Sequence, residues 1–310
     1  AEPLQGWPGF VQQACARVGH RMALVDQRPL LKNGTAITAE TLAWIIFARD
    51  LVLTPGFVAW YLALALLVEQ PAALGYAPPP AAALGLQALL AAAAVVVYWL
   101  HLVAPAPPPD ETEVVQMLSR CGRWVMLTRH CVALQTAHLL LSVAGSGLGS
   151  ARLVRLTEGM AVWIGALGFY VTVQFFTLVF PNPEFQERCE RAMKRDPPTN
   201  LRRMASLNHA PAAVLAALDV ALAKGRAAMR AECSLAATLG LAALYVLLYL
   251  LLIVANHRAT GCWPYPFLKA FGLGKWVIFV IVQTAIFIGF VLLVWSLLFL
   301  PLGWGTERPR

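Results

Sequence analysis

The stretch Ser234–Ala255, SLAATLGLAALYVLLYLLLIVA, decides the fold of this 310-residue chain. It contains no charged residue, and as a helix it is long enough to cross a hydrocarbon core about 30 Å thick. Long apolar runs of this kind are typical of membrane proteins rather than of soluble domains. The stretch therefore predicts a transmembrane helix.

The same length criterion, applied outward from this stretch, finds further spans on both sides. Proline-rich segments separate the early ones, because proline cannot continue a helix. The clearest further spans are Ala82–Val103, Trp124–Val143, Gly159–Phe180 and Lys275–Leu300.

Two weaker segments bring the predicted number of spans to about seven. Ala43–Val68 contains Arg49 and Asp50, so it is either a crossing or an interfacial helix followed by a shorter span. Leu207–Leu222 is short, and its polar residues must face protein or water, because burying them in lipid is costly. The predicted fold class is all-α, a polytopic transmembrane helix bundle of six spans plus one extra N-terminal apolar segment.

Composition indicates a membrane protein and argues against nucleic acid as a partner. Hydrophobic residues make up 59% of the chain and charged residues 13%, whereas soluble domains carry about 25% charged residues. The net charge of +8 comes from Lys and Arg residues in loops, which form no dense basic tract. If all seven segments cross, most of these cations lie on the N-terminal side, which places that side in the cytosol, matrix or stroma.

Neither a metal site nor a cofactor is predicted. The six cysteines show no CxxC and no paired-ligand spacing. Two of four histidines in or near spans could ligate haem iron, but nothing in their local sequence marks a haem site: His101, His138, His209 and His257. Bound structural lipids are the only ligands expected.

Polar residues inside spans are the candidates for chemistry. Thr128 and Gln135 are seven residues apart, which places them about 20° apart on one helix face. On another helix, His209 and Asp219 could point into the same interior. A threonine hydroxyl activated by a histidine would form a nucleophilic pair. The alternative is that Thr128 bonds a backbone carbonyl and His209 packs or caps a helix.

The loop Asn182–Arg203 carries a regular pattern of charged residues. Its charges are spaced three and four residues apart, which is typical of a helix with paired surface charges. It predicts a helix that contacts lipid head groups or a neighbouring subunit.

Several segments resemble the androgen-induced membrane hydrolases. Gly122–Thr128, GRWVMLT, followed by Val132–Gln135, VALQ, is similar to that family's W-K-F-L-T … L-V-x-Q stretch. Leu207-Asn-His209, and later Tyr245 with Thr260–Pro266, TGCWPYP, resemble its L-N-H and Y … T-G-x-W-x-Y-P signatures. The resemblance covers residues 82–302.

This resemblance implies a six-span hydrolase of fatty acid esters of hydroxy fatty acids, with a threonine nucleophile at Thr128 and a catalytic histidine. The family reads N-H-x-x-H-T, with the second histidine catalytic, where this chain reads Asn208-His-Ala-Pro-Ala-Ala213. A literal match places the catalytic position on Ala212 and breaks the dyad. A three-residue deletion places it on His209 instead.

Three further residues are predicted to support such a dyad. In the register with the deletion, Asp219 falls where the family has an acidic residue, and either Asp219 or Asn208 could orient the imidazole. Gln135 lies on the same face as Thr128. Both registers remain open.

The chain departs from the family in two places. The loop between the family's second and third spans is reduced to roughly Gly145–Glu158, and residues 1–81 form an extension. The predicted organisation is an N-terminal extension with one interfacial or transmembrane helix (1–81), a six-span membrane hydrolase-like bundle (82–302) and a short polar tail (303–310).

Two functional hypotheses follow. The first is a non-catalytic accessory subunit of a large organellar complex of respiratory-chain or ATP-synthase type, in the mitochondrial inner membrane. The extension, the missing initiator Met and the altered histidine motif favour it, and its partners would be membrane lipids and other subunits. The second is an intramembrane threonine hydrolase of fatty acid esters, with the endoplasmic reticulum or another organelle membrane as the alternative location. A transporter would require internal symmetry that the sequence lacks.

Overall fold

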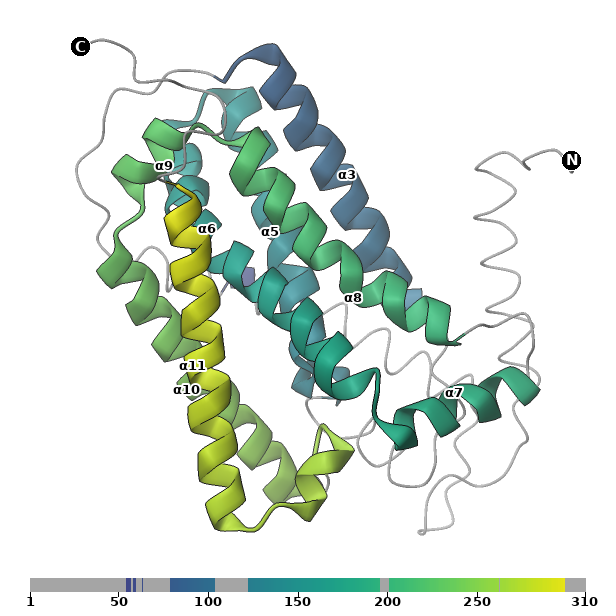
Figure 1. Cartoon of the computed structure of the whole chain (residues 1–310). Helices are drawn as coiled ribbons and strands as arrows, with labels where there is room; N and C mark the ends of the chain where they lie inside the picture. The colour runs from purple at the N-terminus through teal and green to yellow at the C-terminus, as the bar shows by residue number, and fades with distance from the viewer. Residues whose placement is uncertain are drawn as a thin grey trace, which may run out of the picture.

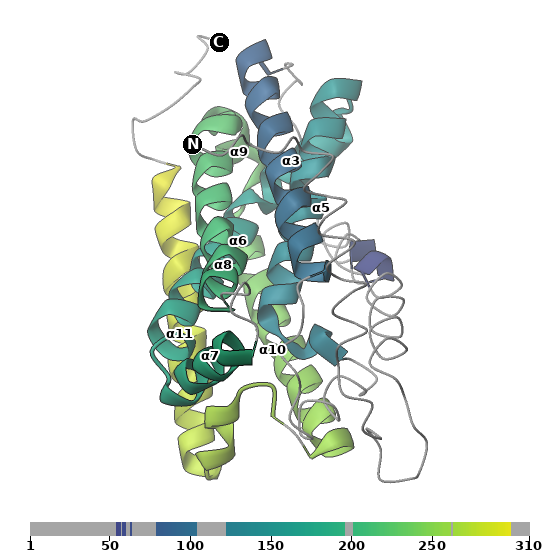
Figure 2. The ribbon, with the colours of Figure 1, turned by 90° about the vertical axis from the view of Figure 1, so that its right-hand side faces the viewer.

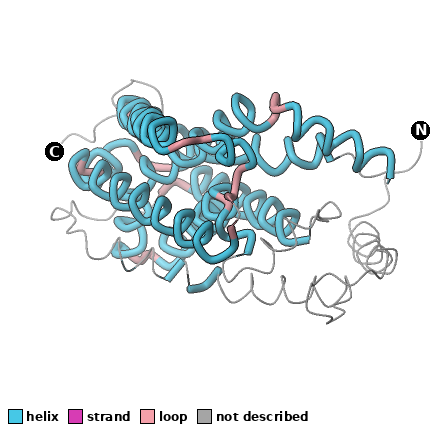
Figure 3. The backbone as a smooth tube through the Cα atoms, turned by 90° about the horizontal axis from the view of Figure 1, so that it is seen from below, coloured by secondary structure: helices cyan, strands magenta, loops and turns pink. Residues whose placement is uncertain are grey.

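The computed structural model describes residues 54–56, 58, 59, 63, 79–103, 122–195, 201–261 and 263–298. Within these residues every regular element is a helix (Figures 1 and 3). Six stretches are long and apolar enough to cross a membrane: Ala81–His101, Leu127–Leu148, Ala151–Val179, Ala205–Ala223, Leu235–Ala259 and Leu273–Leu297. The predicted all-α membrane bundle is therefore confirmed. Most of the proposed extra segment Ala43–Val68, and all of the tail 303–310, lie outside the described residues.

The bundle helices are α3 (Ala81–Val103), α5 (Leu127–Leu148), α6 (Ala151–Gln174), α8 (Leu201–Leu218), α10 (Leu235–Thr260) and α11 (Leu273–Leu297). Two π-helices extend them, η2 (Phe175–Val179) after α6 and η3 (Asp219–Ala223) after α8. The shorter elements are the 3-10 helices η1 (Gly122–Val125) and η4 (Pro266–Ala270), and the helices α7 (Pro183–Arg195) and α9 (Arg226–Glu232).

Helices α5 and α6 lie at the centre of the bundle (Figures 1 and 2). In the apolar part of the α5 span, 56% of the residues are buried inside the bundle. The corresponding share for α11 is 17%, so the apolar surface of α11 faces outward. The largest core cluster surrounds Trp163 and Leu167 of α6, together with Tyr245 of α10 and Val291 of α11. A membrane protein can expose apolar faces such as that of α11, because lipid covers them.

Helices α5 and α8 run in the same direction. Their side-chain contacts occur in the same order along both: Thr128 contacts His209, and ten residues later on each side His138 contacts Asp219. One end of the bundle therefore holds the starts of α5 and α8 and the end of α6, and the opposite end holds η3, α9 and the start of α10.

The prediction of a loop at roughly Gly145–Glu158 is wrong. Helix α5 continues to Leu148 and α6 begins at Ala151, with only Gly149 and Ser150 between them. Gly149 has a left-handed backbone, φ 65°, and the Ser150 side chain accepts a hydrogen bond from the Leu153 amide. A Cβ on Gly145 would lie 2.9 Å from the Leu153 Cβ, so this glycine lets the two helices approach closely. The family's loop is thus reduced here to a tight helical hairpin.

The predicted charged helix is present as α7, which lies across one end of the bundle (Figures 1 and 2). Cys189 on its inner face is fully buried. The Arg202 guanidinium at the start of α8 donates a hydrogen bond to the Gln186 carboxamide oxygen. These contacts fix α7 to the bundle end where α6 finishes and α8 begins.

Candidate functional site

Thr128 and His209 meet between α5 and α8. Thr128 lies in the first turn of α5, and its Oγ1 is 3.0 Å from Nε2 of His209. Both side chains are half-buried. The two residues are 81 positions apart in sequence, so only the packing of α5 against α8 brings them together.

The second ring nitrogen of His209 sets the direction of this hydrogen bond. Nδ1 lies 2.7 Å from the backbone oxygen of Ala205, which can only accept. Nδ1 therefore carries the hydrogen of the neutral imidazole, and Nε2 presents its lone pair. The Thr128 hydroxyl must donate to Nε2. This is the tautomer that a general base needs beside a hydroxyl nucleophile.

Pro211 interrupts the hydrogen bonding of α8 beside the site, and three neighbouring helices supply partners there. His101 of α3 donates to the Asn208 carbonyl at 3.0 Å. Thr172 of α6 donates to the His209 carbonyl at 2.7 Å, and Gln135 of α5 donates to the Ala212 carbonyl at 2.6 Å. Side chains from α3, α5 and α6 therefore hold the backbone that carries His209.

The predicted supporting residues Gln135 and Asn208 both take part in these contacts around Pro211. Gln135 faces α8, as its seven-residue spacing from Thr128 suggests. Asn208 contributes its backbone carbonyl and does not hydrogen-bond the His209 ring. The close approach also depends on Gly168, where a Cβ would lie 2.7 Å from the Ala212 oxygen and 2.9 Å from Gln135 Nε2.

A tyrosine network positions the start of α5. The Leu127 amide donates to the Tyr265 hydroxyl at 3.3 Å, and the Tyr249 hydroxyl donates to the Val125 carbonyl at 3.0 Å. The two hydroxyls lie 3.3 Å apart. Burial raises the pKa of Tyr265, which lies in the loop outside the spans, so it stays protonated. Sequence reasoning missed Tyr249 and Tyr265 as site residues, although Tyr265 belongs to the TGCWPYP segment.

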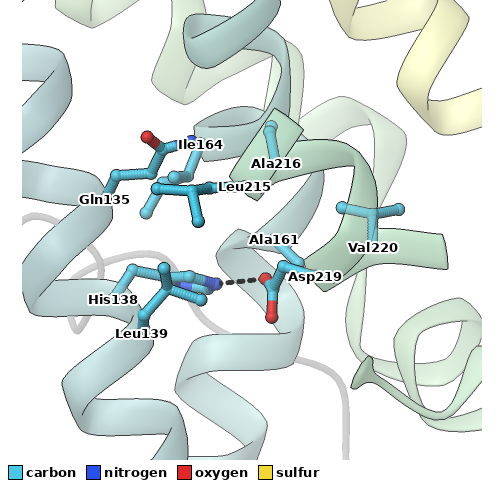
Figure 4. Close-up of a pocket in the computed structure, with 10 residues that line it drawn as sticks. Gln135, His138, Leu139, Ala161, Ile164, Leu215, Ala216, Asp219 and Val220 are labelled. Atoms are coloured by element: carbon cyan, nitrogen blue, oxygen red, sulfur yellow. Dashed lines mark hydrogen bonds and ion pairs between the residues drawn. The ribbon is translucent and has the colours of Figure 1, made fainter. Parts of the chain in front are cut away.

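Asp219 does not orient His209, which corrects that prediction. Its Oδ2 lies 3.0 Å from Nε2 of His138 (Figure 4), and its Oδ1 lies 3.9 Å from Nζ of Lys224. Lys224 also donates to Ser142 at 2.8 Å. Ten residues of helix correspond to about 15 Å, so Asp219 is too far along α8 to reach the dyad. His138, Ser142 and Lys224 complete a second polar cluster, buried between α5 and the end of η3.

A small interior gap lies beside the His138–Asp219 pair (Figure 4). Apolar side chains form most of its wall, including Ile164 and Leu215, while Gln135 and the ion pair border it. The second polar cluster meets the α8–η3 segment at Asp219, ten residues beyond His209. The two polar sites are thus distinct.

Two of the histidines considered as haem ligands bond protein groups near the site. In the described part of the chain, no three His, Cys, Asp or Glu side chains gather as a metal site requires. The His101 and His209 rings lie 6.3 Å apart, but His101 Nε2 is bonded to a carbonyl and His209 Nε2 to Thr128. Neither nitrogen is therefore directed at a shared iron position.

Comparison with known protein families gives one match. The family described as FAR-17a/AIG1-like protein matches residues 86–297, which is more than half of the chain and includes the whole Thr128–His209 site. No curated protein and no solved structure matches the chain significantly. The matched range agrees with the resemblance found in the sequence. The chain belongs to the FAR-17a/AIG1-like family.

Proposed function

We propose that this protein is an intramembrane threonine hydrolase of fatty-acyl esters. The observation that carries the proposal is the 3.0 Å contact between Thr128 Oγ1 and His209 Nε2, with the imidazole tautomer fixed by the Ala205 carbonyl. A nucleophile within hydrogen-bond reach of a base, with that base oriented by a third group, is the arrangement that covalent catalysis requires.

The reaction would proceed in two halves. Thr128 Oγ1 attacks the ester carbonyl carbon while its proton moves to His209 Nε2. The imidazolium then gives that proton to the departing alkoxide, which leaves as an alcohol and leaves an acyl ester on Thr128. Water attacks this ester, loses a proton to His209, and releases the fatty acid as Thr128 regains its hydrogen.

The position of the pair suits an amphiphilic ester. Thr128 is the second residue of its span, and His209 lies about one turn inside the span that begins at Ala205. Large apolar side chains beside the pair are exposed at the bundle surface, including Phe176 of η2 and Leu207 of α8. A lipid whose ester lies near the membrane boundary could place its acyl chains along these surfaces.

The contact also favours one of the two sequence registers. Ala212, the catalytic position under a literal match, is buried, and its carbonyl bonds Gln135. His209, the position reached with a three-residue deletion, contacts Thr128. We therefore assign the base role to His209.

The test is hydrolysis of a fluorogenic long-chain ester by the purified full-length protein in nanodiscs. Thr128→Val and His209→Gln are each expected to lower kcat at least about 100-fold, because each removes a group that acts in proton transfer or bond formation. Thr136→Val is the matched control, since Thr136 lies on the same helix and bonds only backbone carbonyls in the described structure. Equal turnover by wild type and Thr128→Val would refute the proposal.

The accessory-subunit role in a mitochondrial inner-membrane complex stays a prediction from the sequence. Stoichiometric co-purification with a large membrane complex would support it, and isolation of the protein alone from native membranes would count against it. Neither result alters the test of the dyad.

A further inference from the structure

We infer that Phe175 is a positioning residue whose ring face stabilises the positive charge that His209 acquires when it accepts the Thr128 proton. The inference rests on the proposed hydrolase function. It names a source of charge stabilisation for a histidine whose ring, within the described residues, bonds no carboxylate.

The geometry places the Phe175 ring directly over the imidazole. The ring centroids lie 3.6 Å apart and the planes differ by 9°, so the two rings stack face to face. Phe175 is 4% exposed, so water does not compete for this face. The imidazolium would lie well within the roughly 6 Å over which an aromatic face attracts a cation.

In the part of the chain that the structure describes, neither nitrogen of the His209 ring is bonded to a carboxylate. Among the described residues, the two ring nitrogens of His209 bond only the Thr128 hydroxyl and the Ala205 carbonyl, both uncharged. In the Ser-His-Asp triad, a buried aspartate stabilises the charged histidine. Here Asp219 is hydrogen-bonded to His138 instead, and the ring of another histidine, His101, lies edge-on to His209 at 6.3 Å.

An aromatic face can supply part of the missing stabilisation. The quadrupole of a phenyl ring makes its face negative, and its attraction for a cation grows as water is removed. Neutral histidine gains much less from that face than imidazolium does. The interaction therefore strengthens along the reaction, which is the condition for it to raise kcat rather than only tighten binding.

Contacts from three helices hold the Phe175 ring in place at the end of α6. Phe175 begins the π-helix η2, with the Phe180 amide bonded to the Phe175 carbonyl at 2.7 Å, and π-turns often mark functional positions. One turn earlier, Thr172 bonds the His209 carbonyl. The Phe185 ring of α7 packs edge-on against Phe175 at 5.9 Å. Helices α6, α7 and α8 together hold the ring over His209.

The experiment separates ring electrostatics from packing. Phe175 is replaced in the full-length protein by 4-fluoro-, 3,5-difluoro- and 3,4,5-trifluorophenylalanine, which keep the ring shape and progressively weaken its negative face. We expect kcat to fall stepwise, by roughly two- to thirtyfold over the series given the usual range of cation–π strength, while KM changes little. The same series at Phe290 of α11, whose ring stacks on Phe169 and not on a histidine, is the control and should leave kcat unchanged.

A second readout does not depend on turnover. In protein labelled with ¹⁵N-histidine, His209 should take up its proton at progressively lower pH as fluorine is added at Phe175, and not when it is added at Phe290. A flat series in this titration would overturn the inference, whatever the activity. If the wild-type protein shows no turnover that depends on Thr128, the proposed function is overturned. The titration then decides the role of Phe175 by itself.

Discussion

Nε2 of His138 and Oδ2 of Asp219 lie 3.0 Å apart inside the bundle, on the same two helices that carry Thr128 and His209. Lys224 completes this buried group with a 3.9 Å ion pair to Asp219. Charges inside a membrane protein are costly unless they are paired. The second polar cluster thus joins α5 to the end of α8 without entering the dyad.

Breaking this cluster on one side should destabilise the protein. Asp219→Leu leaves the Lys224 ammonium buried without its carboxylate, and we expect a loss of about 3–5 kcal/mol. The double change Asp219→Leu with Lys224→Met removes both charges and should recover much of that loss. The stability of both variants is measured by heating them in detergent and quantifying the remaining folded protein by size-exclusion chromatography. If the double variant is no more stable than Asp219→Leu alone, the ion pair between Asp219 and Lys224 does not account for the loss of stability.

Gly168 should tolerate no side chain. Gly168→Ala would place a Cβ 2.7 Å from the Ala212 oxygen, and moving α6 away from α8 is expected to cost about 1–3 kcal/mol and to lower kcat. The control is Gly240→Ala on α10, where a Cβ meets nothing within 4 Å. That change should be neutral or stabilising, because alanine favours a helix. Equal stability of the two variants would contradict the close packing of α6 on α8.

Tyr265 should matter for catalysis as well as stability. Tyr265→Phe removes the acceptor of the Leu127 amide, next to Thr128, and we expect about 1 kcal/mol of destabilisation and a severalfold lower kcat. Tyr170→Phe is the matched control, since it loses one hydrogen bond to Gln283 on α11. Both variants should lose similar stability, but only Tyr265→Phe should lose turnover. A fall in kcat of the same size in the control would remove the special role of Tyr265.

The stability contributed by Cys233 should depend on pH. Burial raises the pKa of the Cys233 thiol, which lies between α9 and α10, from 9.0 to about 12. Between these values the folded protein keeps a proton that the unfolded chain releases. Stability therefore falls as pH rises, by at most about 1.4 kcal/mol per pH unit.

Cys233→Ala lacks this titration. The difference in unfolding free energy between wild type and Cys233→Ala should therefore be constant below about pH 9 and shift against the wild type as the pH rises toward 12. Denaturant titrations at pH 8, 9.5 and 10.5 measure the difference. A difference that is independent of pH would show that the thiol is not buried as described.

The six spans could be predicted from sequence because each contains an apolar run long enough to cross a membrane. The α8 span was the weakest prediction, since His209, Pro211 and Asp219 lower its hydropathy. Those groups are satisfied by side chains of other helices, and such partners are invisible in a linear pattern. The hairpin at Gly149 was missed because the predicted spans on either side ended at Val143 and began at Gly159, whereas both helices extend beyond their apolar runs.

The sequence indicated which residues belong to the site better than it indicated which of them contact each other. Helical spacing placed Thr128 and Gln135 on one face, and both do contact α8. Spacing could not show which histidine Asp219 meets, because His138 lies on α5 and His209 on α8, and the contact depends on how these helices pack. Phe175 carried no sequence signal, since its stack on His209 depends on the packing of α6 against α8.

The most direct test of the account is labelling of the purified protein with a fluorophosphonate probe, followed by mass spectrometry of the modified peptide. The account predicts one phosphonate adduct on Thr128, at a rate that falls at least tenfold in His209→Gln, whereas Thr136→Val reacts like wild type. Absence of an adduct on Thr128 in folded protein, or labelling that is unchanged in His209→Gln, would contradict it.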